Sequence, residues 1–174
     1  MRKELLFVFL LFVSMMMDAQ VIEDGVYVIK SSINPHYVID LSGSQVFNGN
    51  NIQLWERNNT SAQYWVILNH NGTVSIRSYI DGNYVIDLNS SNAVSGENIH
   101  LWEWNKTNAQ HWYVRIVNGF YQFHSAVNTN YVIDLRSSNV VSGENIHCWE
   151  ENGTNAQRWI LERIGTVTKV KSGF

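Results

Sequence analysis

Three residue types that could recognise a ligand recur in a fixed order along this 174-residue chain. An aspartate is followed 13 positions later by a glutamine or histidine, and a tryptophan comes two positions after that. A carboxylate accepts hydrogen bonds from hydroxyl groups, and an indole ring offers a flat apolar face, so the pair suits a saccharide ring. The glutamine or histidine could add a polar contact at the rim of the sugar. The three sets are Asp40, Gln53 and Trp55; Asp87, His100 and Trp102; and Asp134, His147 and Trp149.

A constant interval of 47 residues separates equivalent members of the three sets, without insertion or deletion. Such self-similarity identifies an internal repeat. Within each copy, short runs rich in Val, Ile, Tyr and Trp alternate with Asn, Ser and Gly, which predicts strands joined by turns. In the first copy the strands are expected over 26–30, 37–41, 51–56 and 64–68. Asn-Gly and Ser-Gly pairs at 48–49, 95–96 and 142–143 are turn signals, because glycine tolerates positive φ.

Three units of this size and about four strands each predict an all-β fold that closes on itself. Closure buries the inner face of every unit and leaves no long sheet edge. A β-trefoil of about twelve strands, with pseudo-threefold symmetry from the three 47-residue repeats, satisfies this requirement. A three-bladed propeller is the alternative, but propellers usually have at least four blades. The repeats are expected over about 23–70, 71–117 and 118–164.

The alternation of side chains along a strand assigns each candidate residue to a face. In the first copy Ile39 and Leu41 share one face, and Asp40 lies on the other. An ionised aspartate is costly to bury without a partner, so we expect its face, with Gln53 and Trp55, to meet solvent. A tryptophan displayed there beside a polar amide suggests binding. Alternatively, each tryptophan caps the apolar layer and each aspartate caps a turn.

A second triplicated motif, Gln-x-Trp, follows eight residues after each of these tryptophans. We expect its own tryptophans to be the inner-core aromatic residues: Trp65, Trp112 and Trp159. The glutamines count among the candidate carbohydrate-binding residues, although their main expected role is to satisfy backbone groups of a loop beside the pocket. They are Gln63, Gln110 and Gln157.

With the aspartate, the Ile-Gln-Leu-Trp type motif and Gln-x-Trp in triplicate, the chain resembles the ricin-type (R-type) β-trefoil lectins over about residues 22–164. The resemblance implies shallow pockets that bind galactose, N-acetylgalactosamine or related glycans such as xylan, without a metal or cofactor. It places the family's sugar-binding aspartate, polar residue and stacking aromatic residue on the three sets given above.

Two departures from that family pattern stand out. Where many members place a sugar-contacting asparagine before Gln-x-Trp, this chain has alanine, and a nearby asparagine is the candidate substitute: Asn58, Asn105 or Asn152. The disulfides within each repeat of the plant lectins are also absent. The single cysteine, Cys148, stands where the other copies have leucine, so we expect a buried apolar residue rather than a reactive thiol.

Composition excludes several other classes of function. With 12 basic and 15 acidic residues, the net charge of −3 gives no electrostatic basis for binding nucleic acid or an anionic membrane. Aromatic residues make up 13% of the chain and charged residues 16%, which excludes disorder. One cysteine excludes a disulfide framework and a zinc site built on several thiolates. We expect no enzyme, because carboxylates such as Glu150 and Glu151 are sequence neighbours and His36, His70 and His124 have no evident Ser or Cys partner.

The first 20 residues are typical of a secretory signal peptide. A basic start is followed by a largely apolar run of 13 residues and a small residue at position 19. As a helix this run would span only about 20 Å, short of a bilayer core, and a buried first helix is the alternative. The sequence therefore predicts a secreted, extracellular protein with a lectin domain over 21–164 and a short tail over 165–174 to which we assign no role.

Together these features predict a secreted, non-catalytic lectin with up to three shallow pockets. The expected partners are galactose-type glycans or plant and host polysaccharides, with no nucleic acid and no membrane insertion. A separate catalytic or toxin chain is a further possible partner. The alternative is a β-trefoil module that binds a protein, or inhibits a protease, through one loop. Such a function does not require three preserved pockets.

Overall fold

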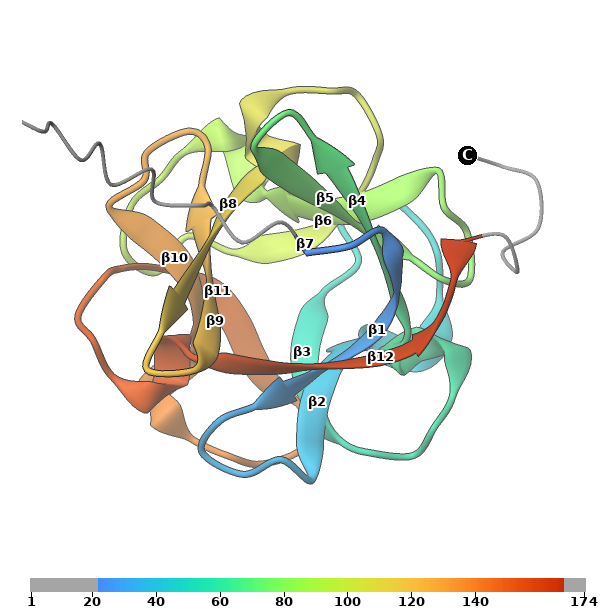
Figure 1. The fold of residues 1–174 in the computed structure, drawn as a ribbon, viewed down its shortest axis with the longest axis horizontal. Helices are drawn as coiled ribbons and strands as arrows, with labels where there is room; N and C mark the ends of the chain where they lie inside the picture. Colours follow the sequence, from blue (N-terminus) through green and yellow to red (C-terminus); the bar gives the residue numbers. More distant parts are fainter. Residues whose placement is uncertain (1–21, 168–174) are drawn as a thin grey trace, which may run out of the picture.

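The computed structural model describes residues 22–167, which form a closed all-β unit (Figure 1). The predicted leader over 1–20 and most of the predicted tail lie outside the described residues. Within them, no helix is long and apolar enough to cross a bilayer. The strands are β1 (Gly25–Ser31), β2 (Tyr37–Leu41), β3 (Ile52–Glu56), β4 (Trp65–His70), β5 (Thr73–Ser78), β6 (Tyr84–Leu88), β7 (Ile99–Glu103), β8 (Trp112–Val117), β9 (Phe120–Ser125), β10 (Tyr131–Leu135), β11 (Glu144–Glu150) and β12 (Trp159–Gly165).

Six of the strands form a barrel, and the other six form three hairpins at one end of it. Antiparallel pairing runs from β1 to β4, β5, β8, β9 and β12 and back to β1, so the barrel closes without a free edge. The hairpins β2–β3, β6–β7 and β10–β11 are related by the repeat. This is the predicted β-trefoil, and the strands expected in the first repeat begin and end within two residues of those observed.

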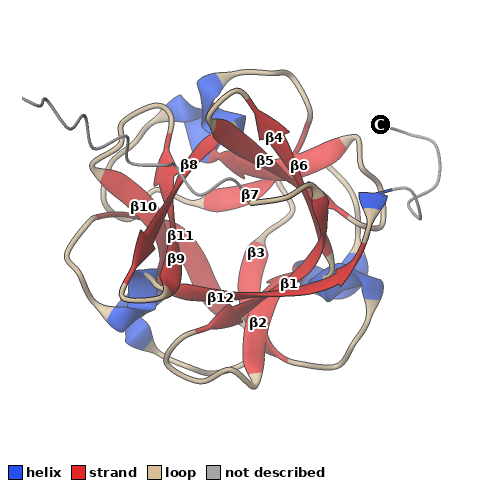
Figure 2. Ribbon diagram, in the orientation of Figure 1, coloured by secondary structure: helices blue, strands red, loops and turns tan. Residues whose placement is uncertain are grey.

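Short 3-10 turns connect the strands at the periphery, as the helical segments in Figure 2 show. Each has three residues, and they fall into two kinds, one after the first strand of each hairpin and one inside the Gln-x-Trp loop. They are η1 (Ser42–Ser44), η2 (Ser61–Gln63), η3 (Asn89–Ser91), η4 (Asn108–Gln110), η5 (Arg136–Ser138) and η6 (Asn155–Gln157).

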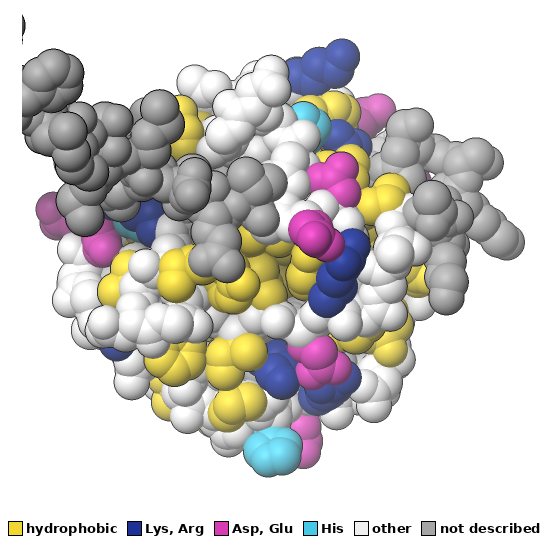
Figure 3. All heavy atoms as spheres, in the orientation of Figure 1, with side chains coloured by type: hydrophobic (Ala, Val, Ile, Leu, Met, Phe, Trp, Pro, Cys, Tyr) yellow, Lys and Arg dark blue, Asp and Glu magenta, His cyan; other side chains and the backbone are white. Residues whose placement is uncertain are grey.

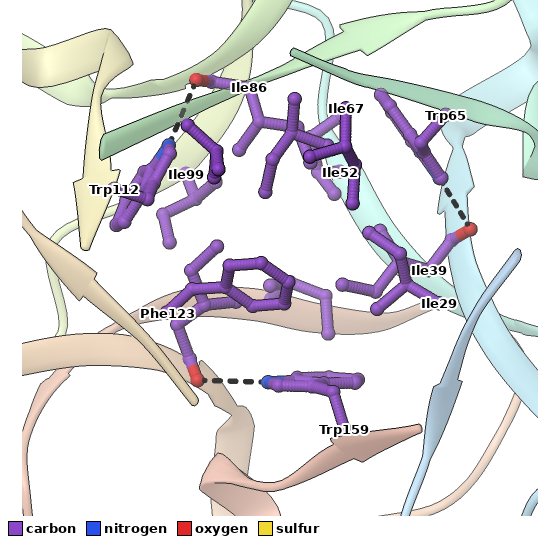
Figure 4. Packing of buried hydrophobic residues seen from close by; sticks show 14 of the residues in the cluster. Ile29, Ile39, Ile52, Trp65, Ile67, Ile86, Ile99, Trp112, Phe123 and Trp159 are labelled. Atoms are coloured by element: carbon purple, nitrogen blue, oxygen red, sulfur yellow. Dashed lines mark hydrogen bonds between the residues drawn. The ribbon is translucent and has the colours of Figure 1, made fainter. Parts of the chain in front are cut away.

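The core lies inside the barrel and is organised around three indoles. Trp65, Trp112 and Trp159 are fully buried, and Figure 4 shows them around one apolar centre with Phe123. Each indole Nε1 donates to a backbone carbonyl of a hairpin, at 3.0, 3.4 and 3.3 Å, which satisfies its only polar atom. The acceptors are Ile39 O, Ile86 O and Ile133 O. The predicted role of the Gln-x-Trp tryptophans is confirmed.

Where the three hairpins meet, three asparagines form a closed ring of hydrogen bonds. Asn51 Nδ2 donates to Asn145 Oδ1 (2.9 Å), and Asn145 Nδ2 donates to Asn98 Oδ1 (2.9 Å). Asn98 Nδ2 then donates to Asn51 Oδ1 (3.1 Å). Each repeat thus donates to one neighbour and accepts from the other.

Cys148 lies on the inner face of β11 and is fully buried, as the sequence predicts. Burial raises the pKa of its thiol to about 12. Because only the thiolate is a good nucleophile, this thiol is chemically inert at neutral pH.

An ionic cluster ties the last strand of the barrel to the first repeat. The Glu162 carboxylate accepts a hydrogen bond from each terminal nitrogen of Arg57, at 2.7 Å, and one from Lys30 Nζ at 3.0 Å. These bonds lower the pKa of Glu162 to about 2. On the face in Figure 3, basic and acidic side chains lie side by side and form no extended patch of one sign.

Because the pKa of Glu162 is low, part of the free energy of unfolding depends on pH in the acid range. The carboxylate is favoured in the folded state, so its contribution is fully present above the ordinary value of 4.5 and is lost as the pH falls through about 2. We expect Glu162→Gln to lower the free energy of unfolding at pH 7 by about 1 kcal/mol or less, and to flatten its decline below pH 4.5. Thermal unfolding from pH 2 to 7 measures this, with Glu56→Gln as the control. An unchanged acid slope in Glu162→Gln would contradict the assignment.

Candidate functional site

Each hairpin brings one predicted set of residues together on its outer face. In the first hairpin Asp40 lies directly opposite Gln53, and Trp55 lies opposite Val38. The pairings Asp87–His100 and Asp134–His147 repeat this register in the other two hairpins. The tryptophans of the three sets, Trp55, Trp102 and Trp149, are 37–39% exposed, so each indole has a face open to solvent.

A hydrogen bond fixes each carboxylate. Gln53 Nε2 donates to Asp40 Oδ1 at 2.9 Å, and His147 Nε2 donates to Asp134 Oδ1 at the same distance. The corresponding distance from His100 Nε2 to Asp87 Oδ1 is 3.1 Å. Since a carboxylate oxygen only accepts, Nε2 of each histidine carries the proton.

The two histidines also orient the neighbouring indoles. His100 stacks on Trp102 and His147 stacks on Trp149, with ring centroids 5.2 Å apart and interplanar angles of 23° and 28°. Each aspartate, histidine and tryptophan therefore forms one connected unit. Within the described residues, Oδ2 of Asp87 and of Asp134 accepts no side-chain hydrogen bond, which leaves it free for the hydroxyls of a ligand.

The aspartates are not displayed on the surface, contrary to the expectation from strand alternation. Asp40, Asp87 and Asp134 are only 5%, 6% and 5% exposed, and their partners Gln53, His100 and His147 are also buried. The loops that end in η2, η4 and η6 pack over the outer face of β2, β6 and β10. The carboxylates tolerate this because each is hydrogen-bonded. They form the floor of a recess and the indoles form its rim.

Asp40 is partly shielded from water, and this burial affects its pKa. Burial raises the pKa of its carboxyl above the ordinary value, and hydrogen bonds from Gln53 and Gln63 offset part of that effect. The carboxylate is thus held in a polar setting that is largely closed to water. Hydrogen bonds formed there by an incoming hydroxyl are stronger than they would be on an open surface.

Hollows lie over the sets of the second and third repeats. The hollow of the third repeat has a volume of about 530 Å³ and is lined by Gly96, Asp134, Leu135, Arg136, Ser137, Ser138, His147, Trp149, Asn152, Thr154 and Ala156. The hollow of the second repeat, about 290 Å³, is lined by Asp87, Asn89, Ser90, Ser91, His100, Trp102, Asn105 and Thr107. Both therefore contain the predicted aspartate, histidine and tryptophan.

Asn105 and Asn152, the predicted substitutes for the missing family asparagine, line these hollows. Asn152 Oδ1 accepts from the backbone N and the hydroxyl of Thr154, at 3.1 and 2.7 Å. Its Nδ2 donates to no other described residue, so it remains available to a ligand. Asn58 makes the same contacts with Thr60 in the first repeat.

Glycines of a neighbouring repeat lie beside the exposed tryptophans of the third and first repeats, a contact that the sequence did not predict. A side chain at Gly96 would meet the indole of Trp149, with its Cβ 3.9 Å from Cζ3, and Gly143 faces Trp55 at the same distance. Both glycines have positive φ, at 93° and 89°. The triplicated Ser-Gly and Asn-Gly pairs predicted the turns but not this contact. Ser137 and Ser138, which both have positive φ, form a second part of the rim of the third pocket.

The Gln-x-Trp glutamines, which the sequence predicts as candidate binding residues, line neither described hollow, and a role in binding remains a prediction. Gln63, Gln110 and Gln157 are fully buried, and their amides are used by the loop that follows β3, β7 or β11. In the third repeat Oε1 of Gln157 accepts Asn152 N and its Nε2 donates to Glu150 O, both at 2.9 Å. Their expected role in satisfying loop backbone groups is confirmed.

Removing one of these glutamines is expected to destabilise the fold. Gln157→Ala leaves a backbone donor and a backbone acceptor without their partner, at a cost of about 1–3 kcal/mol in the free energy of unfolding. Urea denaturation measures the change. The exposed Gln45, replaced by alanine, is the matched control. Equal stability of the two variants would show that the loop does not depend on this amide.

Two of the histidines outside the three sets, His124 and His70, have structural contacts. His124 is buried, and its Nδ1 donates to Thr129 O at 2.8 Å. Contrary to expectation, His70 has a serine partner, since its Nε2 lies 2.8 Å from Ser75 Oγ. That hydroxyl is fully buried, so a substrate cannot reach it. Among residues 22–167, no group of three His, Cys, Asp or Glu side chains could hold a metal ion.

A family model described as ricin-type beta-trefoil lectin domain-like matches residues 18–102, 61–149 and 108–173. No curated protein matches the chain. Among solved structures, a mosquitocidal holotoxin superposes with a TM-score of 0.76 and 22% identity over 83% of this chain and 18% of the toxin. The Rhizoctonia solani agglutinin gives 0.74 and 19% identity over 83% of this chain and 98% of its own. The C-half of an earthworm R-type lectin, in complex with GalNAc, superposes with a TM-score of 0.64 and 24% identity, over 80% of this chain and 99% of the lectin half.

Proposed function

The chain belongs to the ricin-type β-trefoil lectin domain-like family, and from this premise we propose that it is a secreted, non-catalytic lectin for galactose-type glycans. Carbohydrate binding is the property that the family and its lectin neighbours support. The galactose preference, the secretion and the number of working pockets are parts of the proposal.

One observation carries the proposal: a recessed carboxylate and a half-open indole lie side by side in every hairpin. The apolar face of a pyranose would pack on the indole of Trp149, while two neighbouring hydroxyls donate to Asp134 Oδ2 at the floor. Asn152 Nδ2 can donate to a further ring oxygen. Each hydrogen bond to the carboxylate contributes roughly 1.5–3 kcal/mol before the costs of desolvation.

Several features support the finer parts of the proposal. The earthworm lectin half was solved in complex with GalNAc, which favours a galactose-type ligand here. The basic and apolar pattern of residues 1–20 supports secretion. The chain corresponds to 18% of the mosquitocidal holotoxin, so a separate toxin or catalytic partner is proposed as well. No cofactor is included.

Multivalency would supply most of the affinity. A monosaccharide in a shallow pocket typically binds at about millimolar dissociation constant, near −4 kcal/mol. The threefold arrangement directs the pockets away from one another, so several can engage a dense or branched glycan surface. Such engagement raises the apparent affinity by about 10²–10⁴.

The test compares the chain from residue 21 with a variant that carries Asp40→Asn, Asp87→Asn and Asp134→Asn. Asparagine keeps the shape and still accepts from Gln53, His100 or His147, so the fold should persist while the charge is lost. On a glycan array we expect binding to galactose-terminated glycans by the parent and a loss of about 10-fold or more per site in the variant. Equal binding by both proteins would refute the site. Binding to a protein partner that survives all three substitutions would favour the loop alternative.

A further inference from the structure

The pocket of the third repeat differs from the others by one charged residue at its rim. Arg136 lines this hollow, whereas the equivalent positions carry Ser42 in the first repeat and Asn89 in the second. Apart from this position, the second and third pockets both contain an equivalent aspartate, histidine and tryptophan. The guanidinium therefore changes the chemistry of one pocket without altering the part that holds a sugar ring.

A buried carboxylate holds Arg136 in place. Arg136 Nε donates to Glu144 Oε1 at 2.6 Å. Glu144 also accepts from Asn139 Nδ2 (2.7 Å) and Asn145 N (3.0 Å), and these bonds, with Arg136, keep its pKa below the ordinary value despite partial burial. Glu144 is thus a fixed anchor rather than a mobile surface acid.

The two terminal nitrogens of the guanidinium remain open. The Arg136 side chain is 56% exposed, and Nη1 and Nη2 donate to no group among the described residues. These two nitrogens form a planar pair of donors that matches a carboxylate or sulfate in bidentate geometry. The anchor on Nε limits the rotation of the side chain, so less entropy is lost when a ligand binds.

We propose that the pocket of the third repeat prefers an acidic saccharide, one that carries a carboxylate or sulfate on or beside the ring. This inference rests on the proposed lectin function. The sugar ring packs on Trp149, its hydroxyls donate to Asp134, and the anionic group lies toward Arg136. It cannot lie toward the floor, because Asp134 would repel it there.

The second repeat contains the same anchor without the arginine, which provides an internal control. Asn89 Nδ2 donates to Glu97 Oε1 at 2.6 Å, as Arg136 Nε does to Glu144. The second pocket therefore offers an acidic saccharide no cation at this position. An arginine placed at residue 89 should be held by Glu97 in the same way and should transfer the preference.

The test isolates one pocket at a time. Asp40→Asn with Asp87→Asn leaves the third pocket, and Asp40→Asn with Asp134→Asn leaves the second. The two probes are methyl galactoside and the methyl glycoside of galacturonic acid (the galacturonide), which differ only at C6, where the second carries a free carboxylate. Each is titrated against each protein by calorimetry or NMR. We expect the third pocket to bind the galacturonide about 10-fold more tightly than the galactoside at low salt, less so at 0.5 M salt, and the second pocket to show no such preference.

Two substitutions then assign the effect. Arg136→Asn should bring the ratio of the two affinities to about one in the third pocket, and Asn89→Arg should raise it in the second. Galactose 6-sulfate and sialyllactose, measured in parallel, identify which acidic group gives the largest gain. A ratio near one in the unmodified third pocket for every acidic sugar, or a preference that survives Arg136→Asn, would overturn the inference. If neither neutral nor acidic sugars bind the parent, the proposed lectin function itself fails.

Discussion

Alanine at Trp55, Trp102 and Trp149 together is expected to lower affinity for a galactose-coated surface by about 10²–10⁴, because the avidity of three pockets disappears with the stacking faces. The chain should stay folded, since each indole is 37–39% exposed and lies at the rim rather than in the core. Surface plasmon resonance at low and high glycan density measures the loss. Single substitutions should each remove one site and lower the avidity stepwise.

The matched control is Tyr113→Ala. Tyr113 is an exposed aromatic residue on barrel strand β8 and lines neither described hollow. Its replacement should leave surface binding unchanged. If the triple tryptophan variant bound as tightly as the Tyr113 variant, the stacking role of the indoles would be disproved.

Replacing Trp112 by alanine is expected to destabilise the protein far more than the same change at Trp102, only ten residues earlier. Trp112 is fully buried, and its Nε1 donates to Ile86 O. Removing a buried tryptophan from a core typically costs about 3–5 kcal/mol. For a domain of this size, that corresponds to a fall in Tm of about 6–20 °C.

Thermal and urea unfolding of the two single variants provide the comparison. Trp102→Ala should stay within about 1 kcal/mol of the parent, as surface changes usually do. It should nevertheless lose sugar binding at the second pocket, where Trp102 stacks on His100. Similar unfolding midpoints for the two variants would mean that the division between core and rim tryptophans is mistaken.

The fold could be predicted from the sequence because every structural signal occurs three times. The 47-residue interval fixed the symmetry, and the alternation of Ile39 and Leu41 fixed the inner face of the hairpins. The different roles of the two kinds of tryptophan also follow from their positions in the repeat. The Gln-x-Trp tryptophans point into the barrel, whereas those of the three sets lie at the pocket rims. Local pattern and tertiary packing agree throughout these segments.

What lies over a strand could not be predicted from the strand itself. Alternation placed Asp40 on the outer face correctly, but it gave no sign that the loop ending in η2 would cover that face. The contact between Gly143 and Trp55 joins residues from different repeats, as does the anchor of Glu162 on Arg57. Such contacts depend on how the units assemble, and no motif within one unit encodes them.

The asparagine ring where the hairpins meet bears on how such a chain could have arisen. Asn51, Asn98 and Asn145 each donate to one neighbouring unit and accept from the other, as subunits do around a cyclic homotrimer. Nothing in this contact requires the units to be covalently joined. The architecture is therefore compatible with an ancestral peptide of one unit that self-associated head to tail, with later gene duplication and fusion fixing the stoichiometry and freeing each copy to diverge in specificity.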